Sequence, residues 1–473
     1  MLFNSIEFLV FFPVVTTLFF LLPHRYRWSL LLAASCFFYM FFKPEYILIL
    51  AFTIVIDYFA GLLLEKEQDR RKKKIYLIAS LVANIGVLAI FKYYNFINDN
   101  ITGIATLFDI KNPIPYLTIL LPIGLSFHTF QAMSYTIEVY RGNQKAERHF
   151  GIYSLYVMFY PQLVAGPIER PQNILHQFHE KKYFTYDNAV QGLNLILYGL
   201  FMKIVIADRL AVYVNKVYAD IDNASSLSVL MAVCFFSFQI YCDFAGYSNI
   251  ARGTAKFMGY DLMVNFNRPY LAQSIPEFWS RWHISLSTWF RDYLYIPLGG
   301  NRVSAPRWYF NLFIVFLISG LWHGANWTFI VWGALHGIYV VFANVTKSYQ
   351  QRITEVLMLD RVPWLLVGIN RVWVFVLVTF AWIFFRAENF TQASKIISKI
   401  VVFDSSFNLI QLTAGTGPLN ILLSLFAIGL LFLTYKLPSQ LKLRNNLAFL
   451  FVTSFFIIIF GKDVAAEFIY FQF

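Results

Sequence analysis

The stretch Ser319-Gly-Leu-Trp-His323-Gly-Ala-Asn-Trp-Thr-Phe-Ile-Val-Trp-Gly-Ala-Leu-His336-Gly337 lies where two apolar runs of the chain, 308–320 and 326–346, meet. Apolar runs of this kind predict helices in a membrane, and His323 stands at their junction. An ionisable side chain at membrane depth is costly to insert, so one that is present is a candidate for function. His323 is therefore the first candidate functional residue.

The neighbours of His323 strengthen this interpretation. In a continuous helix Ser319 would lie one turn before it, and Asn326 and Trp327 one turn after it, all on one face. The alternative is a buried histidine whose hydrogen bonds merely hold two helices together. For the second histidine of the stretch, His336, we expect packing between helices.

Glycines in the same stretch predict close helix packing. Gly320 and Gly324 form a small-xxx-small pair, and so do Gly333 and Gly337. Small residues at this spacing let another membrane helix approach closely.

The composition indicates a membrane protein. Of the 473 residues, 58% are hydrophobic and 14% are charged, whereas a soluble domain averages about 25% charged residues. The formal net charge of +12 is explained by basic cytoplasmic loops. No Lys/Arg stripe with interleaved aromatic residues lies on a polar segment long enough to bind DNA, so we expect no nucleic-acid partner. The three cysteines form no Cys-x-x-Cys motif, and we expect no metal site. The predicted class is an all-α polytopic membrane protein.

Runs of about 17 to 25 apolar residues mark the expected spans. Together they predict about ten to thirteen transmembrane helices, with 150–165 either a full span or a re-entrant segment. The expected spans are 6–22, 28–42, 46–64, 75–91, 117–139, 188–214, 226–242, 308–320, 325–346, 367–385, 419–435 and 446–460.

The basic loops predict the orientation. The segment EKEQDRRKKK (65–74) carries six Lys/Arg residues and should be cytoplasmic, because cytoplasmic loops are enriched in these residues. Counting back three spans places the N-terminus outside the cytoplasm.

A second polar-rich stretch, 276–302, predicts one amphipathic helix. Its aromatic residues, Trp282 and Trp289 among them, recur at helical spacing. Pro276 would open this helix, and the glycines at 299–300 would close it. The plain interpretation is a helix lying at the cytoplasmic interface. The functional interpretation is a cationic surface for a phosphorylated cofactor, formed by Arg281, Arg291 and Arg302, with Arg252, Lys256 and Arg268 nearby.

These stretches carry a family resemblance. FWSRWHISLSTWFRDYLYIPLGG (278–300) and SGLWHGANWTFIVWGALHG (319–337) resemble the membrane-bound O-acyltransferase (MBOAT) superfamily, in particular its bacterial branch containing the alginate O-acetyltransferase membrane subunit. Supporting matches are YPQLVAGPIER (160–170), QIYCDFAGYSNIARG (239–253) and FIYFQF (468–473). The resemblance covers essentially the whole chain. It implies one MBOAT domain over 1–473, with membrane-spanning, re-entrant and interfacial helices around a central channel.

The resemblance also implies roles for particular residues. His323 matches the active-site histidine of the family, and His283 matches a second catalytic position that this branch fills with histidine. The expected channel lining is Ser319, Asn326, Trp327, Trp282 and Asp243. The expected donor-binding residues are Arg281, Arg291, Arg252 and Trp289.

The reaction implied is acetyl transfer from cytoplasmic acetyl-CoA toward hydroxyls of an extracytoplasmic polysaccharide, either an alginate-like exopolysaccharide or peptidoglycan. His323 would act as general base or as a covalent acetyl carrier, and the base role suits the unperturbed imidazole pKa of about 6.5. His283, Ser319 or Asn326 would hydrogen-bond the thioester oxygen. Acetyl-CoA would be a substrate, with no permanently bound cofactor.

The family resemblance further implies a bacterial cytoplasmic (inner) membrane and an extracytoplasmic SGNH-type partner that completes transfer. Three alternatives stay open. One is a D-alanyl transferase of the teichoic acid type, which would need a carrier-protein donor. Another is a transporter or flippase of an envelope glycan, although the internal repeat typical of transporters is not found. The last is a structural scaffold in an export complex.

Overall fold

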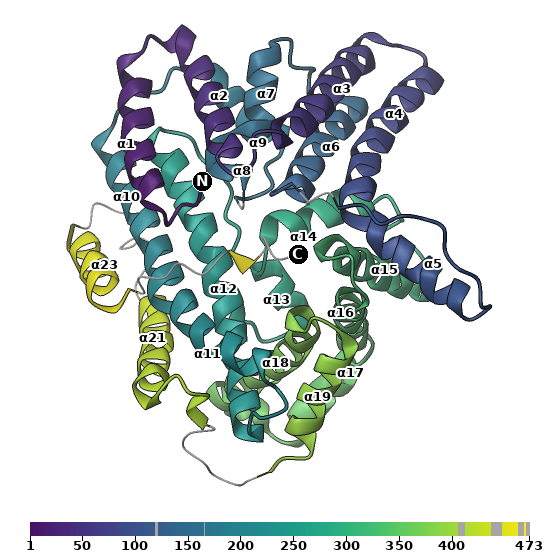
Figure 1. Ribbon diagram of the computed structural model, residues 1–473, viewed down its shortest axis with the longest axis vertical. Helices are drawn as coiled ribbons and strands as arrows, with labels where there is room; N and C mark the ends of the chain where they lie inside the picture. The colour runs from purple at the N-terminus through teal and green to yellow at the C-terminus, as the bar shows by residue number, and fades with distance from the viewer. Residues whose placement is uncertain (119–121, 165, 405–411, 437–446, 462–467, 470–473) are drawn as a thin grey trace. The chain divides into compact units, whose positions relative to one another are not determined.

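The computed structural model describes residues 1–118, 122–164, 166–404, 412–436, 447–461 and 468–469, and their regular structure is helical (Figure 1). Within these residues, six helices are long and apolar enough to cross a membrane. They are α3, α12, α16, α18, α21 and the continuous helix formed by α4, η1 and α5. The prediction of an all-α, multi-pass membrane protein is confirmed.

The chain forms two compact units. The first consists of Met1–Gly199, Tyr247–Met263 and Gln440–Phe451, and the second of Leu200–Gly246, Val264–Ser439 and Val452–Phe473. Helix α12 contributes to both units, because the division falls after Gly246. His283 and His323 both belong to the second unit.

The helices of the first unit come mostly from the first half of the chain, and two of the described ones, α3 and the continuous α4–η1–α5 helix, are long and apolar enough to cross a membrane. In this unit α3, α4 and α6 pack side by side (Figure 1). The helices are α1 (Ile6–Leu21), α2 (His24–Met40), α3 (Tyr46–Lys66), α4 (Arg70–Leu88), η1 (Ala89–Tyr93), α5 (Tyr94–Thr106), α6 (Leu125–Arg141), α7 (Phe150–Met158), α8 (Tyr160–Leu163), α9 (Pro171–His179) and α10 (Tyr186–Leu200).

A group of buried polar side chains lies between α3, α4 and α6. Asp57 of α3 is fully buried and accepts hydrogen bonds from Ser80 Oγ at 2.6 Å and from Asn84 Nδ2 at 2.9 Å. Ser80 also lies 3.2 Å from Thr136 Oγ1 of α6. Buried polar groups need such partners, so this network links the three helices.

The second unit holds the remaining helices, apart from the end of α12 and the start of α23, which belong to the first unit. Within it α15 and α16 form an antiparallel hairpin. The helices are η2 (Phe201–Ala207), α11 (Asp208–Ala219), α12 (Ser226–Phe257), η3 (Pro269–Leu271), α13 (Ile275–Arg281), α14 (Ile284–Phe290), η4 (Arg291–Tyr295), α15 (Ala305–His323), α16 (Trp327–Val345), α17 (Lys347–Val356), η5 (Leu359–Arg361), α18 (Pro363–Arg386), α19 (Phe390–Val401), α21 (Pro418–Lys436) and α23 (Leu447–Phe460).

Three expected spans have different limits in the structure. The span expected at 226–242 is the start of a longer helix, α12, which continues to Phe257. Its interior Asp243 is buried and ion-paired, so the polar residue does not end the helix. The span expected at 75–91 is likewise part of a helix running from Arg70 to Thr106. The span expected at 117–139 begins later, at Leu125, because the chain turns at Gly124 with φ 76°; residues 119–121 lie outside the described part.

The segment 150–165, for which a full span and a re-entrant segment both stayed open, is broken. Helix α7 ends at Met158, and α8 starts at Tyr160, after Phe159, whose ψ of 111° is not helical. Nine and four residues are too few for either helix to cross a bilayer.

Candidate active site

His323 is the last residue of α15. The helix stops at Gly324, whose backbone is extended with φ −159°. The side chain of Asn326 then accepts a hydrogen bond from Thr328 N at 3.0 Å and caps the start of α16. His323 therefore lies at the turn of the α15–α16 hairpin.

This turn corrects the expectation that one helix face carries Asn326 and Trp327 together with His323. Asn326 is the N-cap of the next helix, and its Nδ2 donates to the carbonyl of Glu388 at 3.0 Å. Trp327 begins α16, and its side chain is half exposed. The asparagine ends the continuous helix because its side chain satisfies a backbone donor of α16.

The ring of His323 packs among aromatic rings. It contacts Trp322, Trp332 and Phe385 edge to face, with ring centroids 4.9, 4.9 and 5.3 Å away. The side chain is 4% exposed. Ser319 lies one turn earlier in α15, as the helical spacing predicted, and it is also buried.

His336 packs between helices, as expected. It is fully buried in α16, and its Nδ1 accepts a hydrogen bond from Trp279 Nε1 at 3.3 Å. Trp279 belongs to α13, so this bond joins α13 to α16. Trp332 contacts both His336 and His323, with centroids 5.0 and 4.9 Å away.

The stretch 276–302 is not the single helix that its periodicity predicted. Pro276 does lie in the first turn of α13, but that helix ends at Arg281, and α14 begins at Ile284. Between them His283 adopts the left-handed conformation, with φ 43°. The physical cause is long-range bonding, because Ile284 N donates to the carbonyl of Asn265 at 2.9 Å.

The side chain of His283 is fully buried at this break. Its Nδ1 lies 3.1 Å from Asn265 Oδ1. Its ring contacts Phe244 and Trp322, with centroids 4.7 and 6.3 Å away. Burial lowers the pKa of His283 to about 3. The two candidate catalytic histidines are 40 residues apart in the sequence, and both of their rings contact Trp322.

The predicted aromatic site residues lie in the packed interior of the second unit. Trp282 is 1% exposed and contacts Trp382 and Phe266, with centroids 5.0 and 5.1 Å away. Trp289 is also buried and contacts Tyr293 with centroids 5.1 Å apart.

The arginines expected to bind the donor have acidic or carbonyl partners. Arg281 pairs with Glu277 at 2.7 Å, and Arg291 pairs with Asp292 at 2.8 Å. Arg252 belongs to the first unit, where it lies 3.5 Å from both Asn249 Oδ1 and the carbonyl of Leu262. The side chain of Arg291 is 59% exposed and that of Arg281 is 29% exposed, so Arg291 is the more accessible of these two.

Asp243 lies in a buried charge cluster. Its Oδ1 is 2.6 Å from Lys203 Nζ, which also lies 2.9 Å from Asp208. Its Oδ2 accepts a hydrogen bond from Ile469 N at 2.8 Å. Asp243 therefore ties the end of the described chain to helix α12.

Two residues of this region were not singled out from the sequence. Lys203 was detectable, because a lysine within the apolar run LILYGLFMKIVIAD needs a buried acidic partner. Asn265 follows no motif. Its role depends on residues 18 and 20 positions later in the chain.

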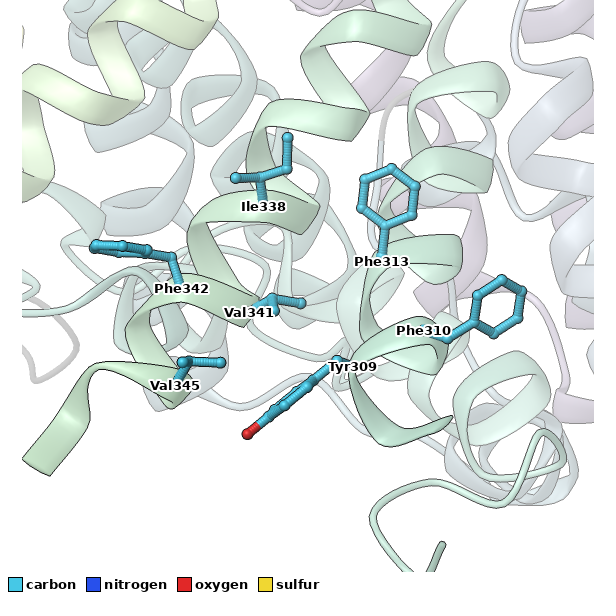
Figure 2. Close-up of a pocket in the computed structure, with 7 residues that line it drawn as sticks. All are labelled: Tyr309, Phe310, Phe313, Ile338, Val341, Phe342 and Val345. Carbon is cyan, nitrogen blue, oxygen red and sulfur yellow. The ribbon is translucent and has the colours of Figure 1, made fainter. Parts of the chain in front are cut away.

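A separate pocket lies at the other end of the α15–α16 hairpin (Figure 2). It is a largely open hollow with a volume of about 440 Å³. Because the lining is almost entirely apolar, this pocket suits apolar groups and is distinct from the surroundings of His323. Its lining residues are Tyr309, Phe310, Phe313, Ile338, Val341, Phe342 and Val345.

Comparison with known proteins identifies the family. The sequence pattern of the membrane-bound O-acyltransferase family, MBOAT, matches residues 148–385. The chain is 39% identical over 420 residues to the probable alginate O-acetylase AlgI of Azotobacter vinelandii, covering 88% of this chain and 81% of the relative. It is 37% identical over 401 residues to the peptidoglycan O-acetyltransferase of Helicobacter pylori, covering 78% and 73%.

A more distant relative is the teichoic acid D-alanyltransferase of Bacillus subtilis, which is 27% identical over 243 residues, covering 49% of this chain and 60% of the relative. The matched family region, 148–385, contains both His283 and His323. The resemblance drawn from the sequence motifs is confirmed. The chain belongs to the membrane-bound O-acyltransferase family and is a multi-pass membrane O-acyltransferase.

Proposed function

We propose that this protein moves an acetyl group from cytoplasmic acetyl-CoA across the bilayer toward hydroxyl groups of an extracytoplasmic polysaccharide. The relatives that cover most of the chain are named for O-acetylation of alginate and of peptidoglycan. The observation that carries the proposal is the placement of two buried imidazoles, His283 and His323, against one indole, Trp322.

His323 is the proposed general base. The hydroxyl oxygen of the acceptor attacks the thioester carbon while the imidazole takes the hydroxyl proton. The carbon–sulfur bond then breaks, and the proton passes to the thiolate of coenzyme A. A positioned base of this kind contributes about 10²–10⁴ in rate.

The placement of His323 at a helix end supports this role. Its ring orientation is restricted by Trp332 and Phe385, which contact it edge to face. A base held in one orientation loses little entropy on reaching the reactive geometry. We prefer this role to that of a covalent acetyl carrier, because a base requires no additional intermediate.

The donor is proposed to bind through its phosphates on the cytoplasmic side. Arg281 and Arg291, with Trp289 beside them in sequence, are the candidates in the second unit, and Arg252 is the candidate in the first. Guanidinium groups suit phosphate because they present planar pairs of donors. Ser319, Trp282 and Asp243 are retained as candidates for the path of the acyl group.

The protein is proposed to lie in the bacterial cytoplasmic membrane with its N-terminus outside, because the basic segment 65–74 belongs inside. An extracytoplasmic SGNH-type protein is the proposed partner that completes transfer to the sugar. The polymer is proposed to be an alginate-like exopolysaccharide or peptidoglycan, in keeping with the names of the relatives.

The test is the acetyl-ester content of secreted and cell-wall polysaccharide in a deletion strain complemented with variants. His323→Ala should reach the membrane in normal amount and lower acetylation to about 1% or less. His176→Ala is the matched control, because His176 is exposed in the first unit, and it should restore full acetylation. Normal acetylation by His323→Ala would overturn the proposal.

The second candidate, D-alanyl transfer, is favoured by the Bacillus subtilis relative but by a shorter match. Purified protein in vesicles separates the two. Labelled acetyl-CoA alone should support label transfer if the acetyl proposal holds, whereas a D-alanyl transferase should require an aminoacylated carrier protein.

A further inference from the structure

The apolar pocket between α15 and α16 begins where the close contact of the two backbones ends. A Cβ atom on Gly337 of α16 would lie 3.2 Å from the Cα atom of Phe313 of α15, so the helices nearly touch there. One turn later α16 carries Val341 instead of a glycine, and one turn after that it carries Val345. Both valines line the pocket with Tyr309 of α15 (Figure 2). Their larger side chains keep the backbones apart and leave the pocket between them.

The lining of this pocket is apolar, and part of it is exposed at the surface of a membrane-length helix. Phe342 of α16 and Phe310 of α15 are both exposed lining residues, and α16 is long and apolar enough to cross a membrane. Water does not fill such a pocket, because a bound water needs two to four polar partners. A hydrocarbon chain is therefore the kind of group that fits this lining.

The neighbouring residues place one end of the pocket at the membrane–water boundary. Trp308 and Tyr309 lie in the first turn and a half of α15, and Trp308 Nε1 donates to Tyr295 Oη at 2.9 Å. Tryptophan and tyrosine are enriched at this boundary. Helix α17, which follows α16, has no buried residue and exposes Tyr349 and Ile353 one turn apart. Such a helix is typical of one that lies in the interface.

Two cationic side chains stand at this end of the pocket. The guanidinium of Arg307 lies over the ring of Phe310, 5.2 Å from its centroid, and Phe310 lines the pocket. Lys347 follows the lining residue Val345 by two positions and is exposed. Neither cation is paired with a carboxylate among the residues that the structure describes. Both are thus available to an anionic group at the level of the lipid headgroups.

We propose that this pocket binds an anionic phospholipid, with one acyl chain between α15 and α16 and the phosphate on Arg307 and Lys347. Basic residues near the surface attract anionic lipids, whereas the ammonium group of a zwitterionic headgroup cancels the phosphate charge. Lys/Arg residues beside the ends of spans are typical of the cytoplasmic side, so we expect the lipid in that leaflet. The inference does not depend on acyl transfer, because its test measures lipid binding.

The test is native mass spectrometry of the purified full chain in detergent, titrated with dioleoyl phosphatidylglycerol or with dioleoyl phosphatidylcholine. The wild-type protein should bind phosphatidylglycerol more tightly. Arg307→Gln combined with Lys347→Gln should weaken this binding about 25-fold, or about five-fold for each cation removed. The same double variant should leave the binding of phosphatidylcholine unchanged.

A second double variant controls for overall charge. Lys72→Gln combined with Lys74→Gln removes the same charge from exposed positions at the start of α4, in the first unit. It should keep the wild-type affinity for the lipid bound in the pocket. Equal weakening by the two double variants would show that the lipid responds to net charge alone, and the proposal would fail.

Filling the pocket tests the position of the acyl chain. Val341→Trp places an indole in the space proposed for the chain and should abolish tight binding of phosphatidylglycerol. Val82→Trp makes the same change at an exposed position of α4 and should keep it. A ligand that binds the folded protein raises its unfolding temperature. Phosphatidylglycerol should therefore raise that temperature for wild type and Val82→Trp, with no such rise for Val341→Trp.

The remaining outcomes contradict the proposal. Equal affinity of the wild-type protein for the two lipids would show that the cations do not select the headgroup. A dimer in the mass spectrum that Val341→Trp dissociates would assign the pocket to a second copy of the chain. If Val341→Trp does not fold, the comparison of the two double variants decides alone, because all four of their positions are exposed.

Discussion

Gly320 of α15 and Gly333 of α16 touch through their backbones: a Cβ atom on either would lie 3.1 Å from the Cα atom of the other. A Cβ on Gly320 would also lie 2.3 Å from the carbonyl oxygen of Phe329. This contact sets the distance between the two helices that meet at His323. The small-xxx-small pattern predicted such an approach, and the contact joins one glycine from each of the two predicted pairs.

Gly320→Leu should therefore force the hairpin apart. Overpacking of this kind costs about 1–3 kcal/mol of the free energy of unfolding, and it should also displace His323 and reduce activity. The measurement is unfolding in detergent together with turnover per folded protein. Gly368→Leu is the control, because a Cβ there meets nothing within 4 Å, and it should change stability by about 0.5 kcal/mol or less. Equal losses in the two variants would contradict the packing argument.

The bond between Trp279 and His336 predicts energetic coupling between α13 and α16. Trp279→Phe leaves His336 Nδ1 without its donor, and His336→Phe leaves the indole N–H without its acceptor. Each should cost about 1–3 kcal/mol of unfolding free energy. The double variant should cost less than the sum of the two, because both remove the same bond.

Thermal or denaturant unfolding of the four proteins gives this coupling directly. Tyr339→Phe serves as a control, since it keeps the ring that contacts His336 at 5.8 Å and should change stability by about 0.5 kcal/mol or less. Strictly additive losses from Trp279→Phe and His336→Phe would show that the bond contributes nothing.

The buried pair of Lys203 and Asp243 predicts a large asymmetry between removing one partner and removing both. Lys203→Met leaves two buried carboxylates without their cation and should cost about 3–5 kcal/mol of unfolding free energy. Lys203→Met combined with Asp243→Asn should recover part of that loss. Lys395→Met, which breaks an exposed pair with Asp222, should cost about 1 kcal/mol or less. Similar effects at Lys203 and Lys395 would contradict the importance of burial.

The polar network of the first unit predicts a graded series at α3. Asp57→Leu removes the acceptor for Ser80 and Asn84 and should cost about 1–3 kcal/mol of unfolding free energy. Asp57→Asn retains an acceptor oxygen and should cost less, as should Ser80→Ala, which removes a single donor. Unfolding curves of the three variants check the order. A Leu variant as stable as the Asn variant would show that the network is dispensable.

Much of the architecture was determined by the sequence itself. Apolar runs alone predicted the limits of α3, α16, α18 and α21 to within a few residues. The preference of a side chain for lipid depends mainly on its own polarity, so these limits follow from the sequence without knowledge of tertiary contacts. The motif around His323 identified the family. The same local pattern placed Ser319 one turn before His323, and the structure keeps that spacing.

The tertiary structure alone decided how the polar residues are used. The periodicity of 276–302 indicated one helix, but Asn265 accepts hydrogen bonds from the backbone N–H groups of Ile284 and Ser285, directly after His283, and the helix is broken there. Asp243 interrupts an apolar run, yet α12 continues through it because Lys203, 40 positions earlier, neutralises it. Hydropathy and periodicity are sums over neighbours in sequence, whereas hydrogen bonds and ion pairs join residues far apart in it. The sequence therefore determined the helices and the family, and the fold determined which distant residues bond His283 and Asp243.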